Sequence, residues 1–514
     1  MLRKIRLTAA AIFFTFITLL FLDFTGTLHL WFGWMAKIQF LPALLALNVS
    51  VLIFLVLLTL LLGRIYCSVI CPLGVMQDIF AWFGKKSKKN RYSYSKPKTI
   101  LRAAVLLLYG VATSAGIGVV TALLAPYSGY GRIVSNLLAP LYQWGNNLLA
   151  YFAERADSYA FYSVDVWVKS LPTLVVAALT LIILAVLAWR GGRTYCNTIC
   201  PVGTVLGMLA KYSWFKPVID TAKCNGCTMC ERNCKASCIN SKEHSIDYSR
   251  CVACMDCIDK CKRGAISFVH IKGGETKLSG STAEEEKSIG GEQKGDNGRR
   301  AFLASAAVLA ASSAVKAQED KVDGGLAVVL DKKAPNRKGK IVPPGALSVA
   351  NFEQHCTGCQ LCVSACPNGV LRPSTDFMSL LQPHSSYEKG YCRPECTKCS
   401  DVCPAGAIRP LDEIEKSSIQ IGHAVWIKKN CLPVTEGVSC GKCASVCPVG
   451  AIQMVKITCD QCVLKCGEDG KKRCAMIPVV NSERGIGCGA CEHLCPSRPF
   501  SAIYVEGHEV HKTV

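Results

Sequence analysis

The chain has 514 residues, half of them hydrophobic, and a mean hydropathy of +0.28, which is high for a soluble protein. Its 32 cysteines recur in tight spacings along a long chain, which argues against the disulfide framework of a small secreted domain and favours metal clusters. The formal charge of +21 counts cysteines as neutral, so thiolates around clusters would cancel much of it. We therefore expect no nucleic-acid partner, since no basic stripe with interleaved aromatic residues supports one.

Four hydrophobic runs are candidates for membrane helices, because a hydrocarbon core of about 30 Å needs about 20 apolar residues. They cover residues 7–22, 41–62, 103–130 and 171–189. The first is long enough if its helix continues past Asp23 into the aromatic-rich stretch FTGTLHLWF. The sequence thus predicts an α-helical membrane domain of four helices over residues 1–212.

Lysine and arginine predict the orientation of this domain. The chain begins MLRKIR, the loop after the second run carries nine basic residues against one acid, Asp78, and the fourth run exits into Arg190 and Arg193. By the positive-inside rule, these parts face the cytoplasm.

An internal repeat follows the second and fourth runs. GRIYCSVICPLG (63–74) matches GRTYCNTICPVG (192–203), so each run ends in a Cys-x3-Cys-Pro motif on the same side of the membrane. The spacing puts both sulfurs of a pair on nearly one face of a helical turn. Three interpretations stay open for Cys67, Cys71, Cys196 and Cys200: a further cluster or metal site, a set of redox thiols, or buried side chains without a site.

Residues 213–270 carry eight cysteines in the spacing of bacterial two-cluster ferredoxins, in which the fourth cysteine of each motif serves the other cluster. The predicted ligand sets are Cys224, Cys227, Cys230 and Cys261 for one 4Fe-4S cluster, and Cys251, Cys254, Cys257 and Cys234 for the other. Lys235 and Lys262 stand where proline usually follows. A pair of zinc sites is the alternative. Cys238 has no assigned role.

Four further cysteine motifs over residues 351–514 predict four more clusters in two pairs. The ligand sets are Cys356, Cys359, Cys362 and Cys403; Cys392, Cys396, Cys399 and Cys366; Cys431, Cys440, Cys443 and Cys495; and Cys488, Cys491, Cys447 and Cys474. In the last two motifs the first ligand position holds Gly437 or Gly485, so Cys431 and Cys474 are expected to substitute. Cys459, Cys462 and Cys466 are the other candidates for the last position. Small apolar stretches after three of the prolines (NGVL, AGAI and VGAI) suit a short helix turning into a strand.

Residues between these parts resemble an export signal inside the chain. Residues 271–300 are polar, glycine-rich and without aromatics, which predicts a linker, and 318–350 are similar. Between them, Arg299 and Arg300 precede a hydrophobic segment over 301–317. This is a twin-arginine pattern, predicted to be a short fifth membrane helix. The alternatives are cleavage near Ala317, or a buried surface helix with the second half cytoplasmic.

Two polar residues near the end of the first run are candidates for contact with a quinol. Asp23 and His29 could accept protons there, or could sit solvated at the outer interface.

Together these motifs resemble two known protein types joined in one chain. Residues 1–270 are similar to the NapH-type membrane subunit of quinol-oxidising electron-supply modules, and residues 295–506 to the exported polyferredoxin of the NapG or MauM type. The resemblance implies α+β ferredoxin-like 4Fe-4S domains, about six clusters, quinol or menaquinol as donor, and an extracytoplasmic reductase or other electron carrier as acceptor. It also implies a multi-pass protein of the bacterial inner membrane, with residues 213–300 cytoplasmic and 318–514 periplasmic.

The sequence predicts electron transfer and not substrate catalysis by side chains. It has no Cys-x2-Cys-His haem motif, no glycine-rich dinucleotide fingerprint and no flavin-attachment motif, so electrons must arrive from quinol or a partner protein. Two rivals remain: a copper-reducing assembly factor of the cytochrome oxidase type, and a non-catalytic ferredoxin tether in a respiratory complex.

Overall fold

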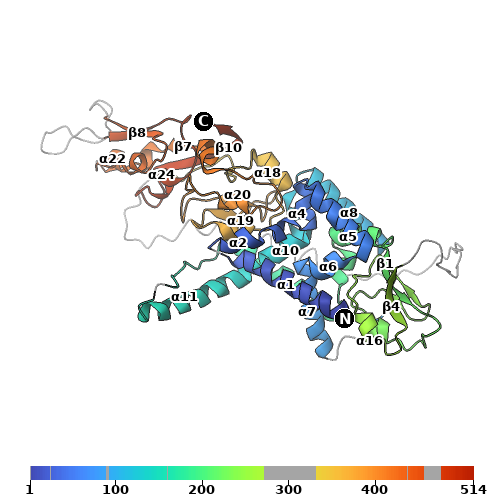
Figure 1. Cartoon of the computed structure of the whole chain (residues 1–514). Helices are drawn as coiled ribbons and strands as arrows, with labels where there is room; N and C mark the ends of the chain where they lie inside the picture. The colour runs from blue at the N-terminus through green and yellow to red at the C-terminus, as the bar shows by residue number, and fades with distance from the viewer. Residues whose placement is uncertain are drawn as a thin grey trace, which may run out of the picture. The chain divides into compact units, whose positions relative to one another are not determined.

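The computed structural model describes residues 2–23, 25–87, 92–158, 160–270, 332–436, 438–456 and 476–514. By their backbone contacts, residues 1–271 and 332–514 belong to one compact unit (Figure 1). The predicted linker 271–300, the twin-arginine pair and the hydrophobic segment 301–317 lie outside the described residues, as do Gly437, Cys459, Cys462, Cys466 and Cys474.

The first 210 residues are helical. In chain order the helices are α1 (Leu2–Leu22), α2 (Thr27–Phe32), α3 (Trp34–Lys37), α4 (Phe40–Leu45), α5 (Val49–Leu62), α6 (Ile65–Val69), α7 (Pro72–Lys86), α8 (Thr99–Ser114), α9 (Gly118–Leu124), α10 (Pro126–Ile133), the π-helix η1 (Val134–Leu138), α11 (Ala139–Arg155), α12 (Leu171–Gly191), α13 (Thr194–Thr198) and α14 (Pro201–Ala210). A proline in the first turn starts α7, α10, α12 and α14, where its missing N–H is not needed.

The first hydrophobic helix extends beyond its hydrophobic run at the N-terminal end, whereas we expected it to extend at the C-terminal end. Helix α1 does not continue past Asp23 but begins at Leu2, which still makes it 21 residues long. The Asp23 carboxylate accepts hydrogen bonds from the backbone N–H groups of Thr25, Gly26 and Leu28 at 2.8–3.0 Å, and so turns the chain. An Asx-type turn of this kind competes with helix continuation.

The second and third runs are interrupted where we expected single helices. Leu47 has a φ of 51° and the Asn48 side chain caps α5, so α4 and α5 are separate. Gly116, with a φ of 72°, and Pro126 divide the third run into α8, α9 and α10. Among the described helices, α1 and α12 alone have the length and composition to cross a membrane by themselves. For the described residues, a membrane domain of four full-length helices is therefore not confirmed.

Residues 213–270 form a small α+β ferredoxin-like part. Its elements are β1 (Phe215–Ile219), α15 (Met229–Arg232), β2 (Ile239–Asn240), β3 (Ser245–Ile246), α16 (Asp256–Lys260) and β4 (Ile266–His270). Strands β1 and β4 pair antiparallel from Phe215 opposite His270 to Ile219 opposite Ile266, and β2 pairs with β3. The two short helices each carry the third cysteine of a motif.

The C-terminal part repeats this plan. Its elements are α18 (Val349–His355), α19 (Leu361–Ala365), β5 (Leu371–Pro373), β6 (Pro383–Ser385), α20 (Lys398–Asp401), α21 (Glu413–Ser418), β7 (Ile419–Trp426), the 3₁₀ helix η2 (Lys428–Asn430), α22 (Leu432–Thr435), α23 (Lys442–Ser445), β8 (Ile452–Lys456), β9 (Met476–Val480), α24 (Ala490–His493) and β10 (Ile503–Thr513). The pairs β5–β6, β8–β9 and β7–β10 are antiparallel. After Cys366-Pro367 and Cys447-Pro448 the chain makes a turn, not the short helix we expected, and then enters a strand, whereas after Cys403-Pro404 a turn is followed by α21.

The described half of the second predicted linker is part of the fold. Ile341, Val342 and Ala346 are buried, and the Asn430 side chain bonds both the N–H and the C=O of Lys333 at 2.8 Å. These apolar contacts explain why residues 332–350 are ordered although their composition resembles that of a linker.

Candidate metal centres

The first predicted ligand set of the N-terminal ferredoxin part surrounds a single cavity. Cys224, Cys227, Cys230 and Cys261 all line a space of about 260 Å³. The first three come from one loop and α15, whereas Cys261 follows α16, so the crossed arrangement expected from the spacing brings these four sulfurs together.

The second set also lines one cavity, and a fifth cysteine joins it. Cys251, Cys254 and Cys257 face Cys234 from the other motif, and Cys238 lies among them. The Sγ atoms of Cys234 and Cys238 are 3.5 Å apart. Our sequence reasoning left Cys238 without a role, although its position four residues after a ligand was visible in the motif.

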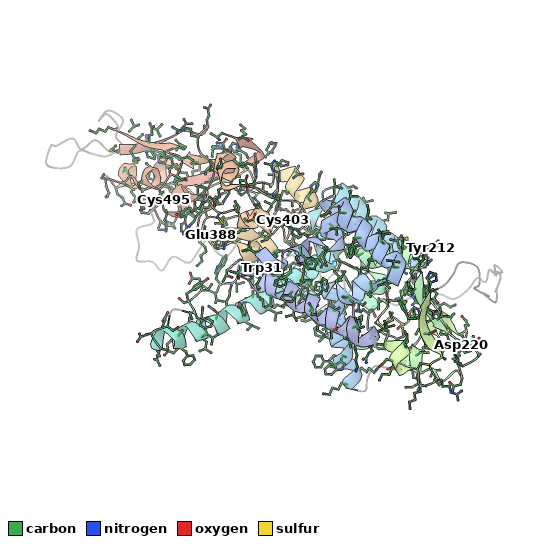
Figure 2. The ribbon with its side chains drawn as sticks, viewed as in Figure 1. Trp31, Tyr212, Asp220, Glu388, Cys403 and Cys495 are labelled. Atoms are coloured by element: carbon green, nitrogen blue, oxygen red, sulfur yellow. The ribbon has the colours of Figure 1, made fainter. Side chains whose placement is uncertain are left out.

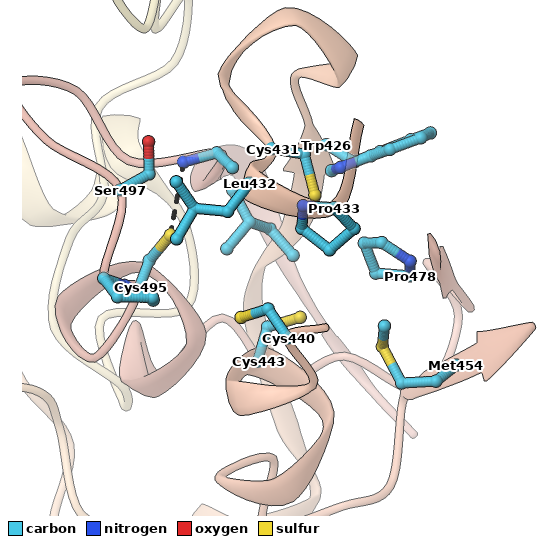
Figure 3. Close-up of a pocket in the computed structure, with 13 residues that line it drawn as sticks. Trp426, Cys431, Leu432, Pro433, Cys440, Cys443, Met454, Pro478, Cys495 and Ser497 are labelled. Carbon is cyan, nitrogen blue, oxygen red and sulfur yellow. Dashed lines mark hydrogen bonds between the residues drawn. The ribbon is translucent and has the colours of Figure 1, made fainter. Parts of the chain in front are cut away.

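Two of the four C-terminal sets line cavities of their own. Cys366 lies with Cys392, Cys396 and Cys399 around one space. Around another, Cys431 and Cys495 stand opposite Cys440 and Cys443 (Figure 3). Cys431 thus lies where we expected it to substitute for the missing first ligand of its motif. Figure 2 shows where Cys403 and Cys495 lie, one in each pair of motifs.

The remaining two sets are brought together as far as the structure describes them. Burial raises the pKa of Cys362, and the nearby thiols of Cys359, Cys356 and Cys403 raise it further. Burial likewise raises the pKa of Cys491, and the thiols of Cys488 and Cys447 raise it further. The fourth member of that last set, Cys474, lies outside the described residues.

Local backbone features orient these sulfurs. Residues at positive φ precede several of the short helices, including Thr228 (58°), Met255 (61°) and Gln360 (65°). Backbone N–H groups then donate to ligand sulfurs: Ala265 to Cys261 at 3.3 Å, and Ala451 to Cys447 at 3.2 Å. Such bonds stabilise thiolates over thiols.

The donor chemistry fits iron–sulfur clusters better than single ions. Within the described ranges, no three His, Cys, Asp or Glu side chains converge closely enough to hold one metal ion. A cubane has an iron at four separated corners, so its thiolates lie around a cavity and not on a point. Ionised cysteine is the ligand such clusters require, and buried thiols with raised pKa values ionise when a cationic metal replaces the proton.

The two Cys-x3-Cys-Pro motifs meet inside the helical part. Cys67 lies in α6 and Cys196 in α13, Cys71 and Cys200 directly precede α7 and α14, and each of the four is 4 % exposed. Burial raises the pKa of Cys200, and the thiols of Cys196, Cys67 and Cys71 raise it further. The four sulfurs are therefore mutual neighbours, which the spacing within each motif could not have shown. We call Cys67, Cys71, Cys196 and Cys200 the four-cysteine site.

The arginine of each repeat crosses to the other repeat. Arg193 donates to the Cys67 carbonyl at 2.5 Å, and Arg64 donates to the Cys196 carbonyl at 3.1 Å. A Cβ at Gly74 would lie 2.2 Å from the Cys67 carbonyl oxygen, and one at Gly203 would lie 2.1 Å from that of Cys196. The glycine that ends each motif therefore permits this close approach.

The buried arginines have unequal partners. Arg193 is paired with Asp78 at 2.8 Å. Arg64 is fully buried and has no carboxylate partner among the described residues; it donates to Asn197 Oδ1 at 2.9 Å, to the Ser249 carbonyl at 3.1 Å and to Cys67 Sγ at 3.8 Å. Gln77 Nε2 donates to Cys196 Sγ at 3.2 Å. The four-cysteine site is thus surrounded by donors and carries an uncompensated positive charge.

The two quinol-contact candidates form a pair at the end of α1. His29 Nδ1 lies 3.2 Å from Asp23 Oδ2, and the side chains are 9 % and 2 % exposed. His29 Nε2 is buried and has no hydrogen-bond partner in the structure. Neither side chain is solvated, contrary to one of the two sequence interpretations.

Three family models for iron–sulfur proteins match four stretches of the chain. A 4Fe-4S binding domain matches residues 44–90 and 172–220, which include both Cys-x3-Cys-Pro motifs. A second 4Fe-4S binding domain matches residues 352–372, and a 4Fe-4S dicluster domain matches 391–451. No solved structure matches the chain.

A relative of known type decides the family. The ferredoxin-type protein NapG of Escherichia coli is 31 % identical over 221 residues, which cover 39 % of this chain and 83 % of NapG. The chain belongs to the NapG family. The match agrees with the structure of this NapG family member, in which cysteines of different motifs line common cavities, as expected for a ferredoxin-type protein.

Other ferredoxin-type proteins are similar to parts of the chain at lower identity. The ferredoxin-type protein NapH of Haemophilus influenzae is 27 % identical, over 35 % of this chain and 51 % of NapH. The methylamine utilization ferredoxin-type protein MauN of Methylobacillus flagellatus is 26 % identical, over 40 % of this chain and 62 % of MauN. Of the uncharacterized protein MJ0749 of Methanocaldococcus jannaschii, this chain spans 37 %. This NapG family member is thus an iron–sulfur electron-transfer protein of the NapH/NapG type.

The crossed ligand sets lead to a prediction for this NapG family member. Cys261→Ser should release the cluster of Cys224, Cys227 and Cys230, although Cys261 belongs to the other motif, and Cys234→Ser should release the cluster of Cys251, Cys254 and Cys257. Paramagnetic resonance of the dithionite-reduced protein, in which two neighbouring clusters couple magnetically, checks it. If Cys261→Ser instead removed the second cluster, the crossed assignment would be wrong.

Proposed function

We propose that this protein accepts electrons from quinol and passes them, through about six 4Fe-4S clusters, to an extracytoplasmic reductase or another electron carrier. In this proposal it is a multi-pass protein of the bacterial inner membrane. Each cluster, when bound, supplies one-electron transfer, and the protein supplies ligands, burial and order along the chain.

The observation that carries this proposal is that helix α1 contacts a different cysteine-rich part near each end. At its start, Arg3 pairs with Asp256 at 2.8 Å and with Asp259 at 2.9 Å, on either side of Cys257. Just beyond its end, the Thr25 carbonyl accepts a hydrogen bond of 3.1 Å from Lys398, next to Cys399.

The length of α1 supports cluster-bearing parts on two sides of a membrane. Its 21 residues make a helix about 30 Å long, which equals the hydrocarbon thickness of a bilayer. With the basic start of the chain inside, the part over 213–270 faces the cytoplasm and the part over 332–514 faces outward. An exported second half is what the internal twin-arginine pattern predicts.

The contacts of α10 and η1 strengthen the outward placement of the C-terminal part. Asn136 donates to the Gln360 side chain at 2.8 Å, and the Ser135 and Ser364 hydroxyls are 2.9 Å apart. Phe21 and Tyr127 share a buried cluster with Cys359 and Cys362. The first pair of C-terminal cysteine sets therefore packs directly on the helical part, near the end of α1.

The same end of α1 offers a group suited to quinol oxidation. Oxidation of one quinol releases two electrons and two protons, so the site needs a proton acceptor beside an electron acceptor. His29 Nε2 has no hydrogen-bond partner among the described residues and is therefore available to accept a proton from quinol. The Asp23 carboxylate can stabilise the imidazolium that this proton transfer forms. The predicted cluster ligand Cys399 is near this end of α1, because its neighbour Lys398 donates a hydrogen bond to the Thr25 carbonyl.

Electron transfer from quinol is tested with the full-length protein in membrane vesicles of known orientation. A reduced menaquinone analogue should reduce the clusters, observed by low-temperature paramagnetic resonance, and a reporter fused after Val514 should respond on the outer side. Reduction of added copper without any response to quinol would favour a metal reductase instead. A protein inert to both would be a tether, and a reporter on the cytoplasmic side would contradict the proposed topology.

A further inference from the structure

Cys238 is a fifth sulfur at a cavity that needs only four. It is 1 % exposed and lines the same space as Cys234, Cys251, Cys254 and Cys257. Its Sγ lies 3.5 Å from Cys234 Sγ. A 4Fe-4S cluster offers four iron corners, so one of these five cysteines is not a ligand.

The repeats inside the chain identify which sulfur is the extra one. Four residues after the last cysteine, four of the other five motifs carry small apolar residues, Ala265, Val370, Ala407 and Ala451, and the motif that ends at Cys495 carries Pro499. All four are buried, at 2–3 % exposure, as Cys238 is. Counted in the same way, Cys238 follows Cys234 by four residues. Cys234 therefore matches the ligands, and Cys238 matches the alanine.

The local backbone repeats as well. In the four motifs with a small apolar residue, the residue before this position is at positive φ, with Gly264 at 63°, Gly369 at 62°, Gly406 at 68° and Gly450 at 62°. In the motif of Cys238 the same conformation is adopted by Ser237, at 50°. At Ala265 and Ala451, the backbone N–H of the small residue donates to the ligand sulfur. The position thus lies against the fourth cysteine of the motif in these two repeats.

We propose that Cys238 is not a cluster ligand but a thiol that donates its S–H to the Cys234 sulfur and thereby raises the reduction potential of the cluster held by Cys234, Cys251, Cys254 and Cys257. The inference rests on the cluster assigned to this cavity in the proposed function. Hydrogen bonds to ligand sulfurs reduce the electron density on them and favour the reduced cluster, which carries one more negative charge.

The position of this cluster gives the thiol a function in electron transfer. Asn197 donates to the Ala236 carbonyl at 3.1 Å, between Cys234 and Cys238, and Arg64 donates to the Ser249 carbonyl, two residues before Cys251. Of the two clusters in this part, the one beside Cys238 therefore faces the four-cysteine site. A raised potential makes it the better acceptor of the two for electrons that pass between the helices and the ferredoxin part.

The test is a redox titration of the full-length protein, purified without oxygen, with the clusters followed by paramagnetic resonance. Cys238→Ala should keep the iron and acid-labile sulfide of the wild type. At a fixed potential, the reduced-to-oxidised ratio of one cluster should fall about tenfold, equal to about 59 mV for a one-electron couple. Cys238→Ser keeps a donor and should stay near the wild type.

A reciprocal variant makes the test sharper. Ala265→Cys places the same thiol beside Cys261 and should raise the potential of the cluster held by Cys224, Cys227, Cys230 and Cys261. Folding of Cys238→Ala is expected to be normal because three sister motifs carry alanine there.

Loss of one cluster's iron and sulfide in Cys238→Ala would make Cys238 a ligand and overturn the inference, and unchanged potentials in both variants would do so too. Wild-type protein without any cluster would overturn the proposed function itself.

Discussion

Replacing Cys67 or Cys196 with serine is expected to lower the iron and acid-labile sulfide of the protein by the content of one whole cluster. Both residues belong to the four-cysteine site, to which each repeat contributes two sulfurs. Loss of one corner ligand from a buried cluster leaves an iron without its thiolate, so the remaining three thiolates should not retain the cluster. Iron and sulfide analysis of protein purified without oxygen is the measurement.

The charge around the site is the physical reason to expect a cluster there. A fully buried guanidinium without an anion is costly, and among the described residues Arg64 has only neutral acceptors and the Cys67 sulfur within reach. The position of the second repeat that corresponds to Asp78 is Gly207, so no carboxylate balances Arg64 as Asp78 balances Arg193. Four thiolates around a cluster would supply the missing negative charge.

Redox-active thiols make a different prediction for the same variants. If the four cysteines formed disulfides reversibly, iron and sulfide would stay unchanged in Cys67→Ser, and thiol labelling of the denatured protein would differ between oxidised and reduced samples. Cys238→Ala is the matched control, because it removes a buried cysteine beside a proposed cluster but should leave the metal content unchanged.

Asp78→Asn is expected to destabilise the protein by about 3–5 kcal/mol, the usual cost of leaving buried charges unpaired. Asp78 accepts from three cations: Arg193 at 2.8 Å, Arg6 at 3.0 Å and Lys235 at 3.2 Å. These residues come from α1, from the second repeat and from the loop after Cys234. Asp78 thus joins the start of α1, the four-cysteine site and the ferredoxin part. The midpoint of thermal unfolding in detergent should fall accordingly.

The pH dependence of this contribution has a definite sign. Burial by itself would raise the pKa of Asp78, but the charges of Arg193 and Lys235, a hydrogen bond from Arg193 and the charge of Arg6 outweigh burial and hold that pKa far below its usual range. In an unfolded chain an aspartate titrates at about 3.9. The stabilisation is therefore complete above about pH 4 and is lost only in stronger acid. The cost of Asp78→Asn should be equal at pH 6 and pH 8.

Asp220→Asn provides the control for charge removal alone. Asp220, labelled in Figure 2, is paired with Lys223 at 3.2 Å, but both side chains are exposed, and such surface pairs contribute little. An unfolding midpoint that fell equally in both variants, or that did not fall in Asp78→Asn, would contradict the assigned role of Asp78.

The cysteine spacing carried most of the information about the candidate sites. A thiolate must approach an iron corner from a fixed direction, so three cysteines two residues apart and a fourth from a neighbouring motif already define which sulfurs converge. The cavities around Cys224, Cys251, Cys392 and Cys440 bring together the sulfurs that the spacing grouped. Ligation itself stays a prediction that metal analysis must test.

Hydrophobic runs were less informative. A count of apolar residues does not register a single residue at positive φ or a proline, and so it predicted continuous helices where Leu47, Gly116 and Pro126 divide the chain. The count of apolar residues also did not predict that α1 starts at Leu2, because the charges of Arg3 and Arg6 indicated that these residues lie outside the membrane helix. Arg3 and Arg6 are accommodated because Asp256 and Asp78 neutralise them.

By itself the sequence determined the iron–sulfur character of the protein, the grouping of most of its cysteines and the existence of two matching repeats, because these depend on residue type and local spacing. Only the tertiary structure decided that the two Cys-x3-Cys-Pro motifs meet, that Arg64 and Arg193 each donate a hydrogen bond to a cysteine carbonyl of the other motif, and that Cys238 contacts Cys234. Those contacts depend on how distant segments pack, and packing is set by the whole chain at once.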